Sequence, residues 1–148
     1  YYNYKDSDKI KYMQNLHYDP TTFDADYDAN GTEYSSFPLL CEDNVYDVLI
    51  SDKAGVECCS WINLIHPLDT YDGTLKTLFE GELKDRVVTA QDSANHTSAY
   101  AINISGTDFA NRMNLGYNDV YLSFPGNSEE NVDHIIKLLN YIFDLGIE

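Results

Sequence analysis

The chain has 148 residues and a formal net charge of −16 at pH 7, with 9 Lys and Arg against 25 Asp and Glu. This balance argues against direct binding to nucleic acids or to anionic membranes, because both need clustered basic side chains. A hydrophobic content of 43% argues against an intrinsically disordered chain, and the length predicts one domain over residues 1–148.

The first two thirds of the chain are predicted to form a helix, a loop and then strands. Ile10, Met13 and Leu16 recur three residues apart and predict a helix over residues 4–17. Frequent Asp, Ala, Asn and Gly predict a loop over residues 19–33. Apolar runs then predict strands at Phe37–Cys41, Val45–Ser51, Val56–Ile65, Leu75–Ala90 and Ser98–Ile104. A hairpin turn is predicted at 52–55, and a break within Leu75–Ala90 is predicted at Gly81.

The end of the chain has the clearest helical pattern. Residues 107–116 predict a short helical turn, Asp119–Phe124 predicts a strand, and Asn127 with Glu130 has the spacing of a capping box. An apolar stripe with helical period follows and ends at Gly146. Its members are Val132, Ile135, Ile136, Leu139, Ile142 and Phe143. Of these, Ile136 and Leu139 are expected to be buried.

This order of elements predicts an α+β fold. We expect a mostly antiparallel sheet with an N-terminal helix and a C-terminal helix packed on one face.

An acidic segment separates Lys11 from Lys53. These 41 residues have no Lys or Arg, nine carboxylates and five tyrosines. Carboxylates at this density repel one another unless water, a cation or a basic partner neutralises them, and tyrosines supply contact area for a partner. The segment therefore predicts a surface for a basic protein, with these contact residues: Tyr18, Asp24, Asp26, Tyr27, Asp28, Glu33, Tyr34, Glu42 and Asp43.

The loop from Asp24 to Glu33 also resembles the first half of a calcium-binding loop. Asp26, Asp28 and Asn30 place oxygen ligands at alternate positions and Gly31 permits a tight turn, as in an EF-hand. Position twelve counted from Asp26 is Phe37, where a bidentate Glu belongs. A calcium site, a solvated acidic loop and a partner-binding loop remain open, and Ca²⁺ is the one cofactor that the sequence suggests.

Cysteines and histidines predict no catalytic centre. Cys41, Cys58 and Cys59 are expected to be buried reduced thiols, with a disulfide from Cys41 as the alternative; on a strand, Cys58 and Cys59 would point to opposite faces. The four histidines lack metal-binding spacing, and His134 is expected to be a packed histidine on the last helix. Nucleophile and phosphate-loop motifs are also missing, so we expect no enzymatic activity.

Small size, acidity, an α+β pattern and the lack of a catalytic motif are together similar to bacterial immunity proteins, which neutralise toxin domains. The resemblance implies a non-enzymatic inhibitor of a basic toxin or nuclease domain. Alternatives are a secreted or envelope domain with structural calcium in the Asp24–Glu33 loop, a nucleic-acid mimic that blocks a DNA-binding protein, and a small hydrolase. The start at Tyr1 fits either a mature exported protein or a trimmed chain, so a cytoplasmic and an exported location both stay open.

Overall fold

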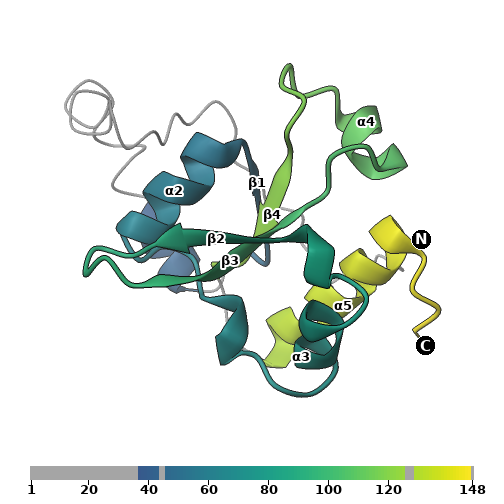
Figure 1. Cartoon of the computed structure of the whole chain (residues 1–148), viewed down its shortest axis with the longest axis horizontal. Helices are drawn as coiled ribbons and strands as arrows, with labels where there is room; N and C mark the ends of the chain where they lie inside the picture. Colours follow the sequence, from purple (N-terminus) through teal and green to yellow (C-terminus); the bar gives the residue numbers. More distant parts are fainter. Residues whose placement is uncertain (1–36, 44–45, 126–128, 148) are drawn as a thin grey trace.

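The computed structural model describes residues 37–43, 46–125 and 129–147 (Figure 1). Three predictions lie outside these residues: the helix at 4–17, the loop at 19–33 and the capping box that starts at Asn127. The prediction of one domain over the whole chain also reaches beyond them.

A four-stranded antiparallel sheet forms the centre of the described part, with the order β1-β4-β3-β2. β1 is Leu49–Ser51, β2 is Val87–Gln91, β3 is Thr97–Asn103 and β4 is Tyr121–Ser123. The register pairs Ile50 with Leu122 and Leu122 with Ile102, so the two central strands are β4 and β3. With helices before and after this sheet, the predicted α+β class and antiparallel pairing are confirmed.

Helices cover both faces of the sheet (Figure 1). Residues 37–42 are helical, and α2 (Lys53–Trp61) lies on the same face as this short helix, because both contribute to one buried cluster. On the opposite face lie α3 (Gly73–Glu80) and α5 (Glu129–Phe143), and α4 (Asp108–Met113) adds Ala110 to their cluster. Short 3-10 turns at Leu68–Thr70 and Lys84–Arg86 connect these elements.

Alternation of side chains along the strands explains how one sheet contributes to the hydrophobic cores on both of its faces. Ile102 and Leu122 face α5, while Ala101 and Tyr121 face α2. The register between β2 and β3 pairs Val88 with Ala101 but Thr89 with Ala99, so Tyr100 is an extra residue. Such a bulge lets Tyr100 and Ala101 both contribute to the α2 side, which simple alternation would forbid.

Several of the predicted elements are wrong. The strands predicted at Phe37–Cys41 and Val56–Ile65 do not form, because residues 37–42 and Lys53–Trp61 are helical. The predicted turn at 52–55 is instead a helix start, because the Asp52 side chain accepts a hydrogen bond from the Gly55 amide at 2.9 Å. In the 75–90 stretch, the break at Gly81 is confirmed, but it separates α3 from β2 rather than two strands.

The remaining described predictions hold within a few residues. β1 lies within the predicted strand Val45–Ser51, β3 within one residue of Ser98–Ile104, and β4 within Asp119–Phe124. α4 occupies the predicted turn at 107–116, and α5 carries the predicted stripe. Across the residues that the structure covers, no helix is both long enough and apolar enough to cross a bilayer.

Candidate functional site

One stripe of α2 is turned away from the core. Lys53, Glu57 and Trp61 are four residues apart and therefore share one side of the helix. Val56, Cys58 and Cys59 on the other sides are buried, whereas Glu57 is exposed and Trp61 retains 46% of its surface. Trp61 is the single Trp of the chain.

Polar contacts fix the orientation of α2. Asp52 caps its first turn. Near its end, the Ser60 hydroxyl shares its one hydrogen between the main-chain oxygens of Glu57 (3.0 Å) and Gln91 (2.9 Å). At the first turn, the Lys53 ammonium donates to the Thr89 carbonyl at 3.1 Å and lies 5.8 Å from the centre of the Tyr121 ring. The helix is thus attached to edge strand β2 at both ends.

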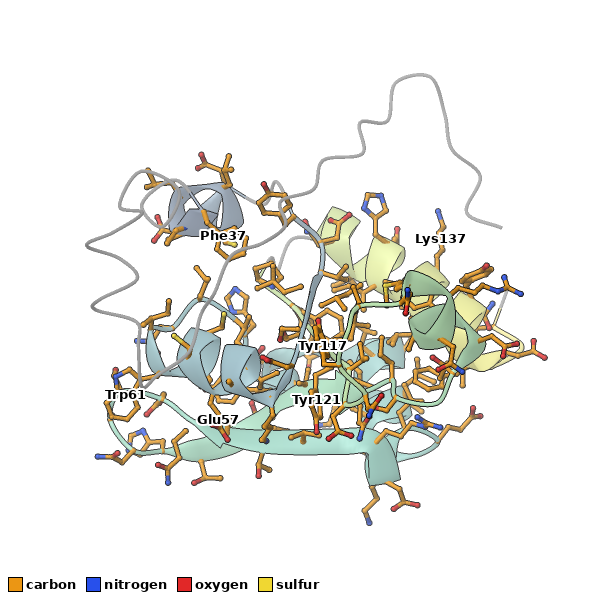
Figure 2. All side chains as sticks on the ribbon, turned by 90° about the horizontal axis from the view of Figure 1, so that it is seen from above. Phe37, Glu57, Trp61, Tyr117, Tyr121 and Lys137 are labelled. Atoms are coloured by element: carbon orange, nitrogen blue, oxygen red, sulfur yellow. The ribbon has the colours of Figure 1, made fainter. Side chains whose placement is uncertain are left out.

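The connection from α4 to β4 borders the same stripe (Figure 2). It turns through Asn114 and Gly116, both with positive φ, and presents Tyr117 with 36% of its surface exposed. Burial, and then the nearby Asp52 carboxylate, raise the pKa of Tyr117. Burial, and then the carboxylates of Asp119 and Glu57, raise the pKa of Tyr121. Two tyrosines and three carboxylates from separate parts of the chain therefore meet here.

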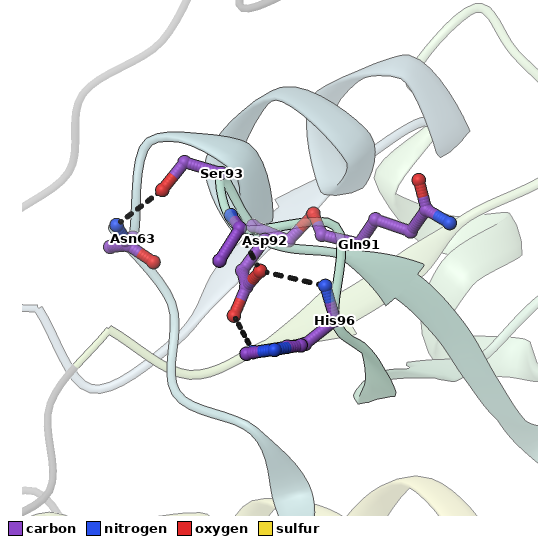
Figure 3. A network of polar contacts seen from close by, with 7 residues as sticks. Asn63, Gln91, Asp92, Ser93 and His96 are labelled. Atoms are coloured by element: carbon purple, nitrogen blue, oxygen red, sulfur yellow. Dashed lines mark hydrogen bonds and ion pairs between the residues drawn. The ribbon is translucent and has the colours of Figure 1, made fainter.

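The β2–β3 hairpin borders α2 at its C-terminal end (Figure 3). Asp92 Oδ1 accepts hydrogen bonds from the amides of Ala94 and His96, each at 2.9 Å, and Asp92 Oδ2 lies 3.6 Å from His96 Nδ1. Asn63, just after α2, donates to the Ser93 hydroxyl at 3.3 Å. Asp92 thus closes the turn, and Asn63 connects that turn to the end of α2.

We name the resulting surface the α2 face and define it by five residues: Glu57, Trp61, Tyr117, Asp119 and Tyr121. Exposed aromatic rings beside carboxylates can bind cationic side chains, through charge and through the negative faces of the rings.

A second polar cluster lies between α5 and the segment before β1. Asp47 Oδ1 accepts a hydrogen bond from Asn131 Nδ2 at 2.6 Å, and Asp47 Oδ2 lies 2.7 Å from His134 Nδ1. Asn131 is buried and His134 is partly buried, so His134 is packed as expected, but with an acidic partner that its helical position did not reveal. We interpret the cluster as a tie between two distant parts of the chain.

Replacing Asp47 by alanine tests this interpretation. We expect the free energy of unfolding to fall by about 1–3 kcal/mol, because a buried amide and an imidazole lose a charged acceptor. The measurement is urea unfolding at pH 7. Asp133→Ala is the control, since Asp133 is exposed on the same helix. Equal stability of the two variants would contradict the structural role of Asp47.

The three cysteines are buried and none of them is in a disulfide, which agrees with the reduced-thiol interpretation. Burial, and then Glu42, raise the pKa of Cys41 to about 12, and burial, followed by Cys58 and Cys41, raises the pKa of Cys59. Such thiols stay protonated at neutral pH and are poor nucleophiles. The expectation that Cys58 and Cys59 point to opposite faces is wrong, because both lie buried on a helix.

Most of the residues predicted to contact a partner or a metal lie outside the described residues. These are Tyr18, Asp24, Asp26, Tyr27, Asp28, Asn30, Glu33 and Tyr34. Glu42 and Asp43 are described, and both are exposed at the end of the 37–42 helix. Among the described side chains, no three His, Cys, Asp or Glu residues are placed to hold a metal ion.

The calcium prediction is tested by thermal unfolding. If Asp26, Asp28 and Asn30 bind Ca²⁺, millimolar calcium raises the melting temperature, because a ligand that binds only the folded state stabilises it. Asp26→Asn combined with Asp28→Asn should abolish that rise. An identical melting curve in calcium and in EDTA would show that the loop holds no calcium.

Comparisons of the chain with protein-family models, curated proteins and solved structures found no significant match.

Sequence reasoning missed the α2 face. The four-residue spacing of Lys53, Glu57 and Trp61 was visible, but it has meaning only on a helix. Residues 52–55 were predicted as a turn and Val56–Ile65 as a strand. Alternation of Tyr117, Asp119 and Tyr121 was also visible, yet nothing local placed it beside α2. The sheet order brings the two together.

Proposed function

We propose that this chain is a non-enzymatic binding protein that inhibits a basic protein, in the manner of an immunity protein bound to a toxin or nuclease domain. The observation that carries the proposal is the α2 face, where exposed aromatic side chains lie among carboxylates. Aromatic residues dominate the binding energy of many protein interfaces, and surrounding charge selects the partner.

The charge of the described surface supports a basic partner. Of the carboxylates whose side chains are described, all but Asp47 and Asp92 are exposed. Two of the few basic side chains already have partners within the protein. Lys53 lies over the Tyr121 ring and donates to the Thr89 carbonyl. Arg86 lies over the Phe143 ring and donates to the Asn103 carbonyl. A strongly negative surface of this kind accelerates encounter with a positive partner.

The test begins with the partner that co-purifies with the protein from its native source. We expect association to slow as ionic strength rises from about 0.01 M to 0.15 M, because the Debye length falls from about 30 to 8 Å. The measurement is surface-binding kinetics with the purified partner. An excess of the protein should also suppress the partner's own activity.

Substitutions in the acidic segment extend the same experiment. Replacing Asp24, Asp26 and Asp28 together by Asn should slow association, and Tyr27→Ala or Tyr34→Ala should speed dissociation. A salt-independent association rate, or a partner that stays fully active when bound, would overturn the proposed function.

A further inference from the structure

We propose that the α2 face is the docking site for a positively charged segment of the partner protein, with Trp61 as its central anchor. This inference rests on the proposed function and adds to it the surface that makes contact and the chemistry that this surface receives: Lys or Arg side chains placed on and around an indole ring.

The composition of the α2 face matches such a segment. Trp61 is among the most exposed of the described large apolar side chains, and Glu57 lies one helical turn before it. Tyr117 and Asp119 come from the connection between α4 and β4, and Figure 2 shows Tyr117 and Tyr121 on the side of Glu57 that faces away from Trp61. Guanidinium and ammonium groups stack on indole and phenol rings, and carboxylates add charge attraction.

A second exposed aromatic residue shows what makes this site specific. Tyr141 on α5 is 51% exposed, but the residue four positions before it is Lys137, so a cation replaces the carboxylate. The Tyr141 ring also packs edge-on against Phe109, with 6.2 Å between the ring centres. Figure 2 shows Trp61 and Lys137 at opposite ends of the molecule. The Lys137–Tyr141 pair therefore serves as a control site, with an exposed aromatic ring of the same spacing but a positive charge in place of the Glu57 carboxylate.

The α2 face is also held in place before any partner arrives. The cap at Asp52, the Ser60 contact with Gln91 and the Asn63 contact with Ser93 fix both ends of the helix. Binding to a surface that is already ordered costs less conformational entropy than ordering a loop. The Lys53 ammonium already lies over the Tyr121 ring, so the exposed rings of Trp61 and Tyr117 are the ones left for an incoming cation.

The experiment uses the full chain and a fluorescein-labelled oligo-arginine peptide, with an oligo-glutamate peptide of the same length as control. Peptide anisotropy measures the affinity, and the emission of Trp61, excited selectively, reports whether the peptide reaches this face. Because the protein has a single Trp, an emission change comes from this position. A chain this acidic is expected to bind oligo-arginine somewhere on its surface. The test of the proposal is therefore whether the peptide binds at the α2 face.

Matched variants locate the contact. We expect Glu57→Gln combined with Asp119→Asn to weaken peptide binding about three- to tenfold, and Trp61→Ala to weaken it at least about fivefold. The control pair, Glu80→Gln combined with Asp85→Asn, removes the same charge from exposed positions elsewhere and should change affinity less than twofold, as should Tyr141→Ala. Circular dichroism confirms that each variant is folded.

The outcomes separate the two proposals. Saturable, salt-sensitive quenching of Trp61, together with selective loss in the Glu57 and Trp61 variants, supports docking at the α2 face. Peptide binding that leaves Trp61 emission unchanged and is weakened equally by both double substitutions overturns the α2 face as the site but leaves a basic partner in place. Absence of oligo-arginine binding even at low salt overturns both.

Discussion

Replacing Phe124 by alanine is expected to lower the free energy of unfolding by about 3–5 kcal/mol, the range for removing a fully buried aromatic side chain. Phe124 follows β4 directly and has no exposed surface. Its ring stacks on Phe79 from α3 with 6.1 Å between centres and meets Tyr71 edge-on at 6.1 Å. The substitution would therefore leave a cavity between the sheet and α3, where three aromatic rings now pack.

Urea unfolding followed by circular dichroism measures the effect. Tyr141→Ala is the control, and as an exposed position it should cost less than about 1 kcal/mol. If the Phe124→Ala variant does not fold, Phe124→Leu, expected to lose about 1–2 kcal/mol, supplies the measurement. Similar costs for Phe124→Ala and Tyr141→Ala would contradict the aromatic cluster.

The second large effect is expected on α5. Leu139→Ala should cost about 2–5 kcal/mol, because Leu139 is fully buried between α5 and the sheet. The sequence predicted the same for Ile136, but in the structure Ile135 is the fully buried neighbour and Ile136 is only partly covered. We therefore expect Ile136→Ala to cost about 1–2 kcal/mol.

Chemical unfolding of the two variants side by side tests this order. The slope of the unfolding free energy against urea should stay unchanged, so that the shift in midpoint reports stability alone. A cost for Ile136→Ala equal to or larger than that for Leu139→Ala would mean that α5 is rotated relative to the arrangement described above.

Local patterns predicted the elements whose periodicity is unambiguous. The stripe of α5 repeats over four turns, and the apolar run Ser98–Ile104 covers most of β3, so both elements were found from sequence. α2 was mistaken for a strand because Val56, Cys58, Cys59 and Trp61 have high strand propensity in a short apolar run. Its Asp52 cap and burial against the sheet determine the helix, and the burial depends on contacts between distant residues.

The candidate site was harder to predict for the same reason. Glu57 and Tyr121 are 64 positions apart in the numbering and meet because β4 lies beside β1, the strand that leads into α2. A sequence shows acidic density along the chain, and this favoured the segment between Lys11 and Lys53. It does not show which carboxylates share a surface with exposed rings.

The contacts that hold α2 also affect how molecules meet one another. β2 is at the edge of the sheet, and an open edge strand can pair with the edge of another molecule and start aggregation. The carbonyls of Thr89 and Gln91, two residues apart, point to the same side, and Lys53 and Ser60 already occupy them. A foreign strand would have to displace both side chains to add along β2. At the other edge, β1 offers three residues, too short a template for stable pairing. Within the described residues, both edges of the sheet are thus poorly suited to pairing with an edge strand of another molecule.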